Sequence, residues 1–103
     1  MAPGTTRPVT SLSTHVLDTA LGRPAAGVRV ELTRENAAVA TAQTDEDGRT
    51  RLGDELEPGV YRLAFTPPSP FFTRVELEIV LGEGHYHVPL LISPYGCASY
   101  RGS

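Results

Sequence analysis

Hydrophobic and polar residues alternate along most of this chain, in short segments separated by Gly, Pro, Asp and Asn. Such alternation is typical of β-strands that bury one face. One clear case is residues 28–33, with Val28, Val30 and Leu32 on the inward face, and another is residues 74–81. The same pattern predicts further strands at residues 13–19, 38–44, 49–52, 60–65, 85–92 and 95–100.

Many short strands with turn residues between them, and almost no helical periodicity, favour an all-β fold, an antiparallel sandwich of two sheets. The 103 residues are enough to bury a core without a metal or a disulfide. Residues 1–10 are rich in Pro and Thr, and we expect them to be a flexible segment. Residues 11–103 are then expected to form a single domain.

Charge and composition narrow the class of protein. The net charge is −3, from 12 acidic and 9 basic residues, and every basic residue is an arginine. No basic stripe is visible, so nucleic acid is not an expected partner. No apolar run is long enough to span a bilayer, and no signal peptide is apparent, so we expect a cytoplasmic protein without a membrane partner. Cys97 is the single cysteine, which excludes an intrachain disulfide.

The sequence His85-Tyr86-His87 combines chemistry with strand alternation. Both imidazoles should point to one side of a strand, and Tyr86 to the other side with the apolar residues that follow. The two histidines are therefore expected on the outer face. His15 is the third histidine of the chain. The spacing alone fits solvated surface residues, and it also fits a tetrahedral metal site with an open position.

Arginine and the last residues of the sequence supply further candidates. Arg49 directly follows the turn Asp47-Gly48, and it could aim its planar guanidinium at a flat anion or simply begin a solvated strand. The sequence closes with Tyr100-Arg101-Gly102-Ser103, which brings a phenol, a guanidinium and a hydroxyl close together. This concentration of polar groups indicates chemistry.

These motifs together resemble the transthyretin-like 5-hydroxyisourate hydrolases. The terminal tetrapeptide is the most specific of them, because it separates the hydrolases from transthyretin itself, the hormone carrier. The matching segments are Ser13-Thr14-His15-Val16-Leu17-Asp18-Thr19, Gly22-Arg23-Pro24-Ala25, Thr44-Asp45 with Asp47-Gly48-Arg49, Gly59-Val60-Tyr61-Arg62-Leu63, residues 85–96 and Tyr100-Arg101-Gly102-Ser103.

The resemblance implies a transthyretin-like sandwich, assembled as a homotetramer (a dimer of dimers) with active sites at a subunit interface. It implies hydrolysis of 5-hydroxyisourate to 2-oxo-4-hydroxy-4-carboxy-5-ureidoimidazoline in urate degradation, without a cofactor or metal. The family's short helix should be missing, because only residues 66–70 join the strand ending near Phe65 to Phe71. The implied catalytic residues are His15, Arg49, His87 and Ser103, and the implied substrate-binding residues are Tyr100, Arg101, Gly102 and His85.

A reaction that adds water to a cyclic amide needs a general base, a group that stabilises the oxyanion, and a clamp for orientation. Histidine suits the base, since its ordinary pKa of about 6.5 is close to working pH. Three other functions compete with this hypothesis. They are a non-catalytic small-ligand carrier like transthyretin, an immunoglobulin-like adhesion or carbohydrate-binding module, and a metalloenzyme.

Overall fold

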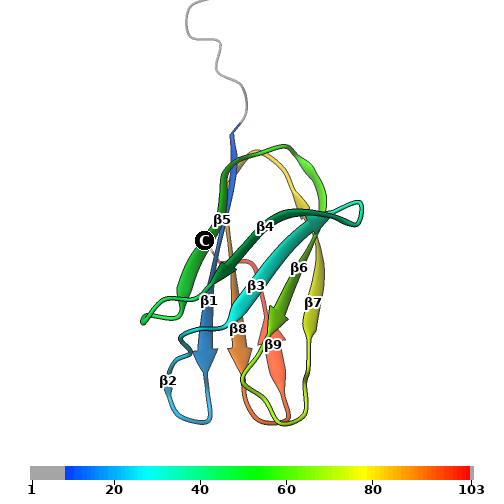
Figure 1. The fold of residues 1–103 in the computed structure, drawn as a ribbon. Helices are drawn as coiled ribbons and strands as arrows, with labels where there is room; N and C mark the ends of the chain where they lie inside the picture. Colours follow the sequence, from blue (N-terminus) through cyan, green and yellow to red (C-terminus); the bar gives the residue numbers. More distant parts are fainter. Residues whose placement is uncertain (1–8, 103) are drawn as a thin grey trace, which may run out of the picture.

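The computed structural model describes residues 9–102, which form nine β-strands and, within that range, no helix (Figure 1). Most of the predicted flexible segment, residues 1–8, lies outside the described residues, as does Ser103. Thr10 already belongs to the first strand and is fully buried. The strands are β1 (Thr10–Asp18), β2 (Arg23–Pro24), β3 (Arg29–Arg34), β4 (Ala37–Gln43), β5 (Arg49–Leu56), β6 (Gly59–Thr66), β7 (Val75–Leu81), β8 (Gly84–Ile92) and β9 (Cys97–Ser99).

The strands build two sheets that face each other, as the alternation predicted (Figure 1). In the first sheet the order is β2-β1-β8-β9, and β5 also pairs with β1; in the second it is β4-β3-β6-β7. We call them sheet A and sheet B. The family helix expected to be missing after β6 is absent from the described chain, and residues 67–74 connect β6 to β7 directly. The two-sheet fold and the lost helix are thus confirmed.

One pair of strands departs from the antiparallel pattern. β1 and β8 run parallel over their whole length, from Thr10 opposite Gly84 to Asp18 opposite Ile92. Alternation determines which face a side chain takes, but it carries no information on strand direction or partner. The parallel pairing therefore had to come from the structure, and it decides which residues meet on sheet A.

The core lies between the sheets and follows the predicted faces. Val28, Val30 and Leu32 are buried, and Leu12 and Val16 of β1 face them from the other sheet. Burying one such side chain contributes about 1.5–3 kcal/mol relative to leaving it exposed. The remaining buried apolar residues are Ala25, Leu52, Tyr61, Leu63, Ala64, Phe65, Val75, Leu81, Val88, Leu90 and Ile92.

Strand ends were the least predictable part. β5 continues to Leu56 rather than stopping at Leu52, although Asp54 and Glu55 are exposed and break the alternation. The pairing of β5 with β1 is irregular near Leu12, so this edge does not keep a strict period of two. Backbone pairing with β1 holds the polar end of β5 in place.

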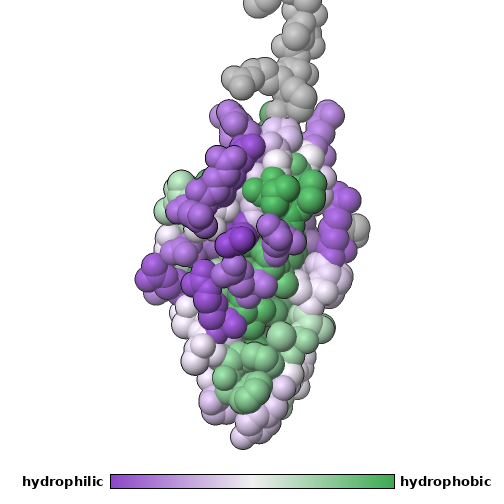
Figure 2. Space-filling view, turned by 90° about the vertical axis from the view of Figure 1, so that its right-hand side faces the viewer, coloured by the Kyte–Doolittle hydropathy of each residue, from purple (hydrophilic) through white to green (hydrophobic). Residues whose placement is uncertain are grey.

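Two further observations describe the surface. Figure 2 shows a hydrophobic band on the side of the molecule where β7 lies, at the edge of sheet B. Val80 of β7 is 72% exposed and Tyr100 is 56% exposed. No helix within residues 9–102 is long and apolar enough to cross a membrane.

Candidate active site

The candidate site lies on the outer face of sheet A, where β1 runs between β5 and β8. Alternation places Ser11, Ser13 and His15 on one face of β1, because Leu12, Thr14 and Val16 are fully buried on the other. The register sets His15 opposite Arg49 of β5 and Ser13 opposite His87 of β8. Three adjacent strands thus bring the candidate residues to one place.

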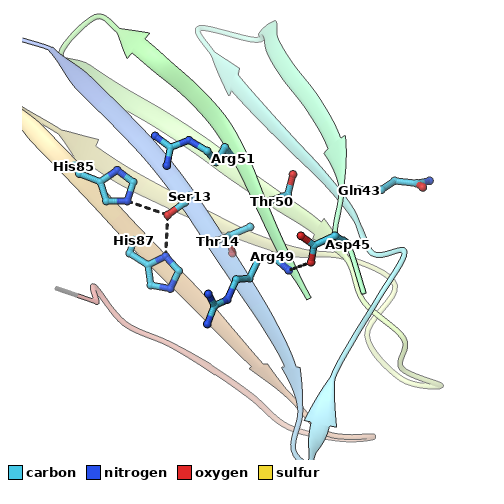
Figure 3. Close-up of a pocket in the computed structure, with 9 residues that line it drawn as sticks. All are labelled: Ser13, Thr14, Gln43, Asp45, Arg49, Thr50, Arg51, His85 and His87. Atoms are coloured by element: carbon cyan, nitrogen blue, oxygen red, sulfur yellow. Dashed lines mark hydrogen bonds between the residues drawn. The ribbon is translucent and has the colours of Figure 1, made fainter. Parts of the chain in front are cut away.

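A tight turn fixes Arg49 at the start of β5. The Asp45 carboxylate accepts hydrogen bonds from the backbone N–H groups of Asp47 and Arg49, each at 2.9 Å. Figure 3 shows the bond from Arg49. Gly48 has a φ of +75°, and a Cβ at this position would lie 2.4 Å from the carbonyl oxygen of Val16. Only glycine fits there, and its own carbonyl accepts from the Val16 N–H at 2.7 Å. The turn therefore holds β5 against β1 beside His15.

The guanidinium of Arg49 is exposed and extends toward His87 (Figure 3). Among the described residues it makes no ion pair within 4.0 Å and no side-chain hydrogen bond. An arginine in this state keeps its planar set of donors available for a ligand.

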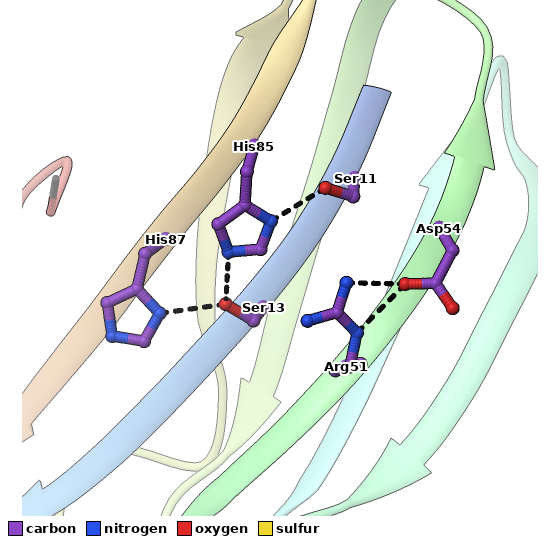
Figure 4. A network of polar contacts seen from close by, with 6 residues as sticks. All are labelled: Ser11, Ser13, Arg51, Asp54, His85 and His87. Carbon is purple, nitrogen blue, oxygen red and sulfur yellow. Dashed lines mark hydrogen bonds and ion pairs between the residues drawn. The ribbon is translucent and has the colours of Figure 1, made fainter. Parts of the chain in front are cut away.

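The two histidines of β8 lie on the outer face, as predicted, and Tyr86 packs against the core from the inner face. A chain of hydrogen bonds links them to β1 (Figure 4). Ser11 Oγ lies 2.7 Å from His85 Nδ1, and Ser13 Oγ lies 3.0 Å from His85 Nε2 and 2.9 Å from His87 Nδ1. Both imidazole rings are thus held in fixed orientations.

The surroundings of His87 lower its pKa below the ordinary value of 6.5. Burial is the largest cause, because desolvation disfavours the charged ring; repulsion by His15, His85 and Arg49 adds to it. His87 is therefore mostly uncharged at neutral pH. A neutral imidazole can accept a proton, which makes this side chain a suitable general base.

His15 completes the group. Its ring lies 6.5 Å from that of His87, centroid to centroid. Its Nε2 atom is buried and has no hydrogen-bond partner among the described residues. A buried polar atom without a partner costs about 1–3 kcal/mol, so this nitrogen is ready to bind a group that supplies a partner.

A cavity of about 650 Å³ opens beside these side chains, within the size range of small-molecule sites. It does not include His15, which lies close by against His87. Most of its walls are polar or charged side chains, which suits a polar ligand. The lining residues are Ser13, Thr14, Gln43, Asp45, Arg49, Thr50, Arg51, His85 and His87 (Figure 3).

The tail beyond β9 approaches the site through Gly102. Its N–H donates to the carbonyl oxygen of His87 at 2.6 Å, and a Cβ on Gly102 would lie 2.9 Å from His87 Cδ2. Arg101 instead lies over the ring of Tyr86, with its guanidinium carbon 4.1 Å from the ring centroid. Tyr100 and Arg101 line a different cavity, of about 470 Å³, between β7 and β8. Their contact with substrate stays a prediction, and Ser103 lies outside the described residues.

Sequence reasoning did not single out Ser11, Ser13 and Arg51. The spacing of Ser11, Ser13 and His15 already placed them on one face, but their partners on β8 are more than 70 positions away. As for the metal hypothesis, no group of three or more His, Cys, Asp or Glu side chains in the described part of the chain could hold an ion.

Comparison with known proteins identifies the family of the chain. The model of the HIUase/Transthyretin family matches residues 12–102. The 5-hydroxyisourate hydrolase of Pseudomonas aeruginosa is 40% identical, over 99% of this chain and 98% of its own. The structure of Klebsiella pneumoniae 5-hydroxyisourate hydrolase has a TM-score of 0.83 and 39% identity, covering 91% of this chain and 99% of that one. Sea bream transthyretin in complex with thyroxine has a TM-score of 0.79 and 28% identity, covering 88% and 93%. The chain belongs to the HIUase/Transthyretin family.

Proposed function

We propose that this protein hydrolyses 5-hydroxyisourate to 2-oxo-4-hydroxy-4-carboxy-5-ureidoimidazoline in urate degradation. The observation that carries the proposal is the meeting of His15, Arg49 and His87 on three adjacent strands, with the Nε2 of His15 and the guanidinium of Arg49 unpartnered among the described residues. The similarity to enzymes named 5-hydroxyisourate hydrolase supports the choice of substrate.

In the proposed mechanism, a water molecule attacks the carbonyl carbon of the cyclic amide. His87 Nε2 takes a proton from the water as the new C–O bond forms, and the carbonyl electron pair moves onto its oxygen. When the oxyanion collapses, the C–N bond breaks and the imidazolium returns its proton to the leaving nitrogen. His15 would help to position the attacking water next to His87, once substrate binding gives its buried Nε2 a partner.

Arg49 would stabilise the negative charge that develops on the substrate oxygen. Its guanidinium is free of carboxylate partners among the described residues and extends toward His87, so it can donate two parallel hydrogen bonds to a flat anion. His85 lines the cavity and is assigned to substrate binding. The proposal assigns Ser103 to catalysis, and it assigns Tyr100, Arg101 and Gly102 to substrate binding. The contact between Gly102 and the carbonyl oxygen of His87 supports a place for the tail beside the site.

We also propose a homotetramer with its sites at a subunit interface. Exposed apolar residues support association, above all Val80 at 72% and Tyr95 at 75% exposure. In such an assembly a second subunit would bring Tyr100 and Arg101 toward a neighbouring site. Size-exclusion chromatography with light scattering tests the oligomeric state, and a monomer with full activity contradicts the tetramer.

We also propose a cytoplasmic location. The exposed thiol of Cys97 fits a reducing compartment, and cell fractionation tests the location.

The alternative of a non-catalytic carrier is not favoured by any observation of the site. The cavity next to His87 is lined by histidine, arginine and hydroxyl side chains, whereas a carrier of an apolar ligand needs an apolar wall.

The decisive experiment generates 5-hydroxyisourate in situ from urate with an oxidase and follows its ultraviolet decay. Adding the protein, with a chelator present, should accelerate the decay. Decay at the spontaneous rate over a range of protein concentrations would reject the proposed activity and leave the carrier as the better hypothesis.

A further inference from the structure

We propose that Ser13 is a positioning residue that sets the protonation of His87 and connects it to the exposed His85. This inference deepens the proposed function and rests on it. The hydroxyl of Ser13 lies between the two rings, 2.9 Å from His87 Nδ1 and 3.0 Å from His85 Nε2. Ser11 continues the chain at the far nitrogen of His85, at 2.7 Å (Figure 4).

The number of hydrogens limits how this chain can be arranged. A serine hydroxyl has one hydrogen to donate, and each neutral imidazole has one N–H. If His87 Nδ1–H donates to Ser13, then Ser13 donates to His85 Nε2, and His85 Nδ1–H donates to Ser11. If the chain runs the other way, Ser13 donates to His87 Nδ1 and the hydrogen of His87 sits on Nε2. One serine thereby couples the tautomers of both rings.

Only the first direction suits catalysis, because it leaves Nε2 of His87 free to accept the proton of the attacking water. Groups that hydrogen-bond to the other ring nitrogen and so fix a histidine tautomer are common at metal sites. Placing the hydrogen on Nδ1 is thus the first effect expected of Ser13.

The same chain can move charge. When His87 Nε2 gains a proton, its Nδ1 proton can pass to Ser13 as the Ser13 hydrogen passes to His85 Nε2. His85 then carries the positive charge, Ser13 is unchanged, and His87 is neutral. The reverse movement restores the Nδ1 proton as Nε2–H is given to the leaving nitrogen, so no proton is gained or lost over the cycle.

The charges around His87 explain why moving its positive charge to His85 would be favourable. His15 of β1, His85 of β8, and Arg49 and Arg51 of β5 all face this region. The one carboxylate that lines the cavity, Asp45, accepts hydrogen bonds from backbone N–H groups of its own turn. Arg51 forms an ion pair with Asp54, which neutralises part of its charge (Figure 4). A charge on half-buried His87 is therefore unfavourable, and moving it to exposed His85 places it nearer to water.

The test compares three variants: Ser13→Ala, Ser13→Thr, which keeps the hydroxyl, and Ser11→Ala, a matched loss of hydroxyl on the same face of β1. Nitrogen NMR of the histidine side chains, recorded without substrate as a function of pH, reports which nitrogen carries the hydrogen. In the unchanged protein His87 should be mainly protonated at Nδ1, and Ser13→Ala should shift it toward Nε2–H. Ser13→Thr should keep the His87 tautomer, and Ser11→Ala, which removes only the partner of the far nitrogen of His85, should shift it less than Ser13→Ala does.

In the hydrolysis assay Ser13→Ala should lower kcat about tenfold, a part of what general base catalysis contributes. KM should stay within about twofold, since Ser13 acts through His87. Ser13→Thr should restore most of kcat.

The two proposals fail in different ways. If the unchanged protein does not hydrolyse 5-hydroxyisourate but Ser13→Ala still shifts the His87 signals, the function is wrong and the positioning role stands. If the protein is active and the unchanged His87 is already an Nε2–H tautomer, or Ser13→Ala leaves both tautomer and kcat unaltered, the relay is wrong.

Discussion

The outer faces of the two sheets are built by the same alternation but differ in how their charges are paired. On sheet B, Arg62 lies 3.7 Å from Glu76, and Arg74 lies 3.0 Å from Glu76 and 3.9 Å from Glu31. On sheet A, the described residues give neither Arg49 nor His87 a carboxylate partner within 4.0 Å. The face of sheet B pairs its arginines with carboxylates, whereas the face of sheet A leaves Arg49 unpaired among the described residues, beside His87 and a polar cavity.

This contrast separates stability from function. Exposed ion pairs such as those of sheet B contribute about 0–1 kcal/mol each, and they leave nothing for a ligand to bind. The unpaired donors of sheet A contribute little to folding and are free to act on a polar substrate. A substitution on the face of sheet A should therefore lower the activity much more than a matched substitution on the face of sheet B. The two variants should differ little in stability.

Replacing His87 should have the largest effect. His87→Asn removes the base and should lower kcat by about 10²–10⁴-fold, the usual contribution of general acid–base catalysis. The melting temperature should change little, because the imidazole lies on the outer face rather than in the core. The ultraviolet assay and a thermal melt measure both quantities. Loss of the fold in this variant would mean that His87 is a structural residue.

The Arg49→Ala variant should have the second largest effect on activity, and Arg62→Ala on sheet B is its control. Loss of the donor to the oxyanion should lower kcat/KM by about 10²–10³-fold. Arg62→Ala breaks an exposed ion pair with Glu76 and should leave the rate unchanged. Stabilities of both variants should lie within about 0.5 kcal/mol of the parent in urea melts. Equal losses of activity on the two faces would contradict the assignment of the site to sheet A.

Gly102→Ala should have a smaller effect. The added Cβ would lie 2.9 Å from His87 Cδ2 and would have to move either the imidazole or the tail. Small displacements of a catalytic group are costly, and we expect kcat to fall about tenfold. Gly96→Ala, where the nearest atom is the Ser93 hydroxyl at 3.1 Å, is a control at the same end of the chain. A fully active Gly102→Ala protein would show that the tail does not position His87.

Much of this arrangement could be predicted from the sequence, and the limits have physical reasons. Alternation placed His85 and His87 on an outer face, and the Asp-Gly turn pointed to Arg49. The role of Ser13 was not predicted, because it depends on a parallel pairing that brings together residues 74 positions apart. The contact of Arg101 with the ring of Tyr86 could not be predicted either, since the side chain of a tail residue can turn to either face of a sheet.

The smallest expected effect is in the pH dependence. Burial and the neighbouring positive charges keep the pKa of His87 below 6.5, so the acid limb of kcat/KM should have its midpoint below pH 6.5. Between the pKa of His87 in the folded protein and 6.5, the unfolded chain binds more protons than the folded one, so stability should fall as pH falls through this window. His87→Asn should abolish that slope.

The causes of the lowered pKa can be tested one at a time. Arg49→Ala removes one of the repelling charges and should move the pKa of His87 upward, while Arg49→Lys should not. High salt should also move it upward, but only in part, because desolvation is the largest cause and is not screened. An acid limb at or above pH 6.5, with no response to Arg49→Ala, would mean that the charges collected on sheet A do not act on His87.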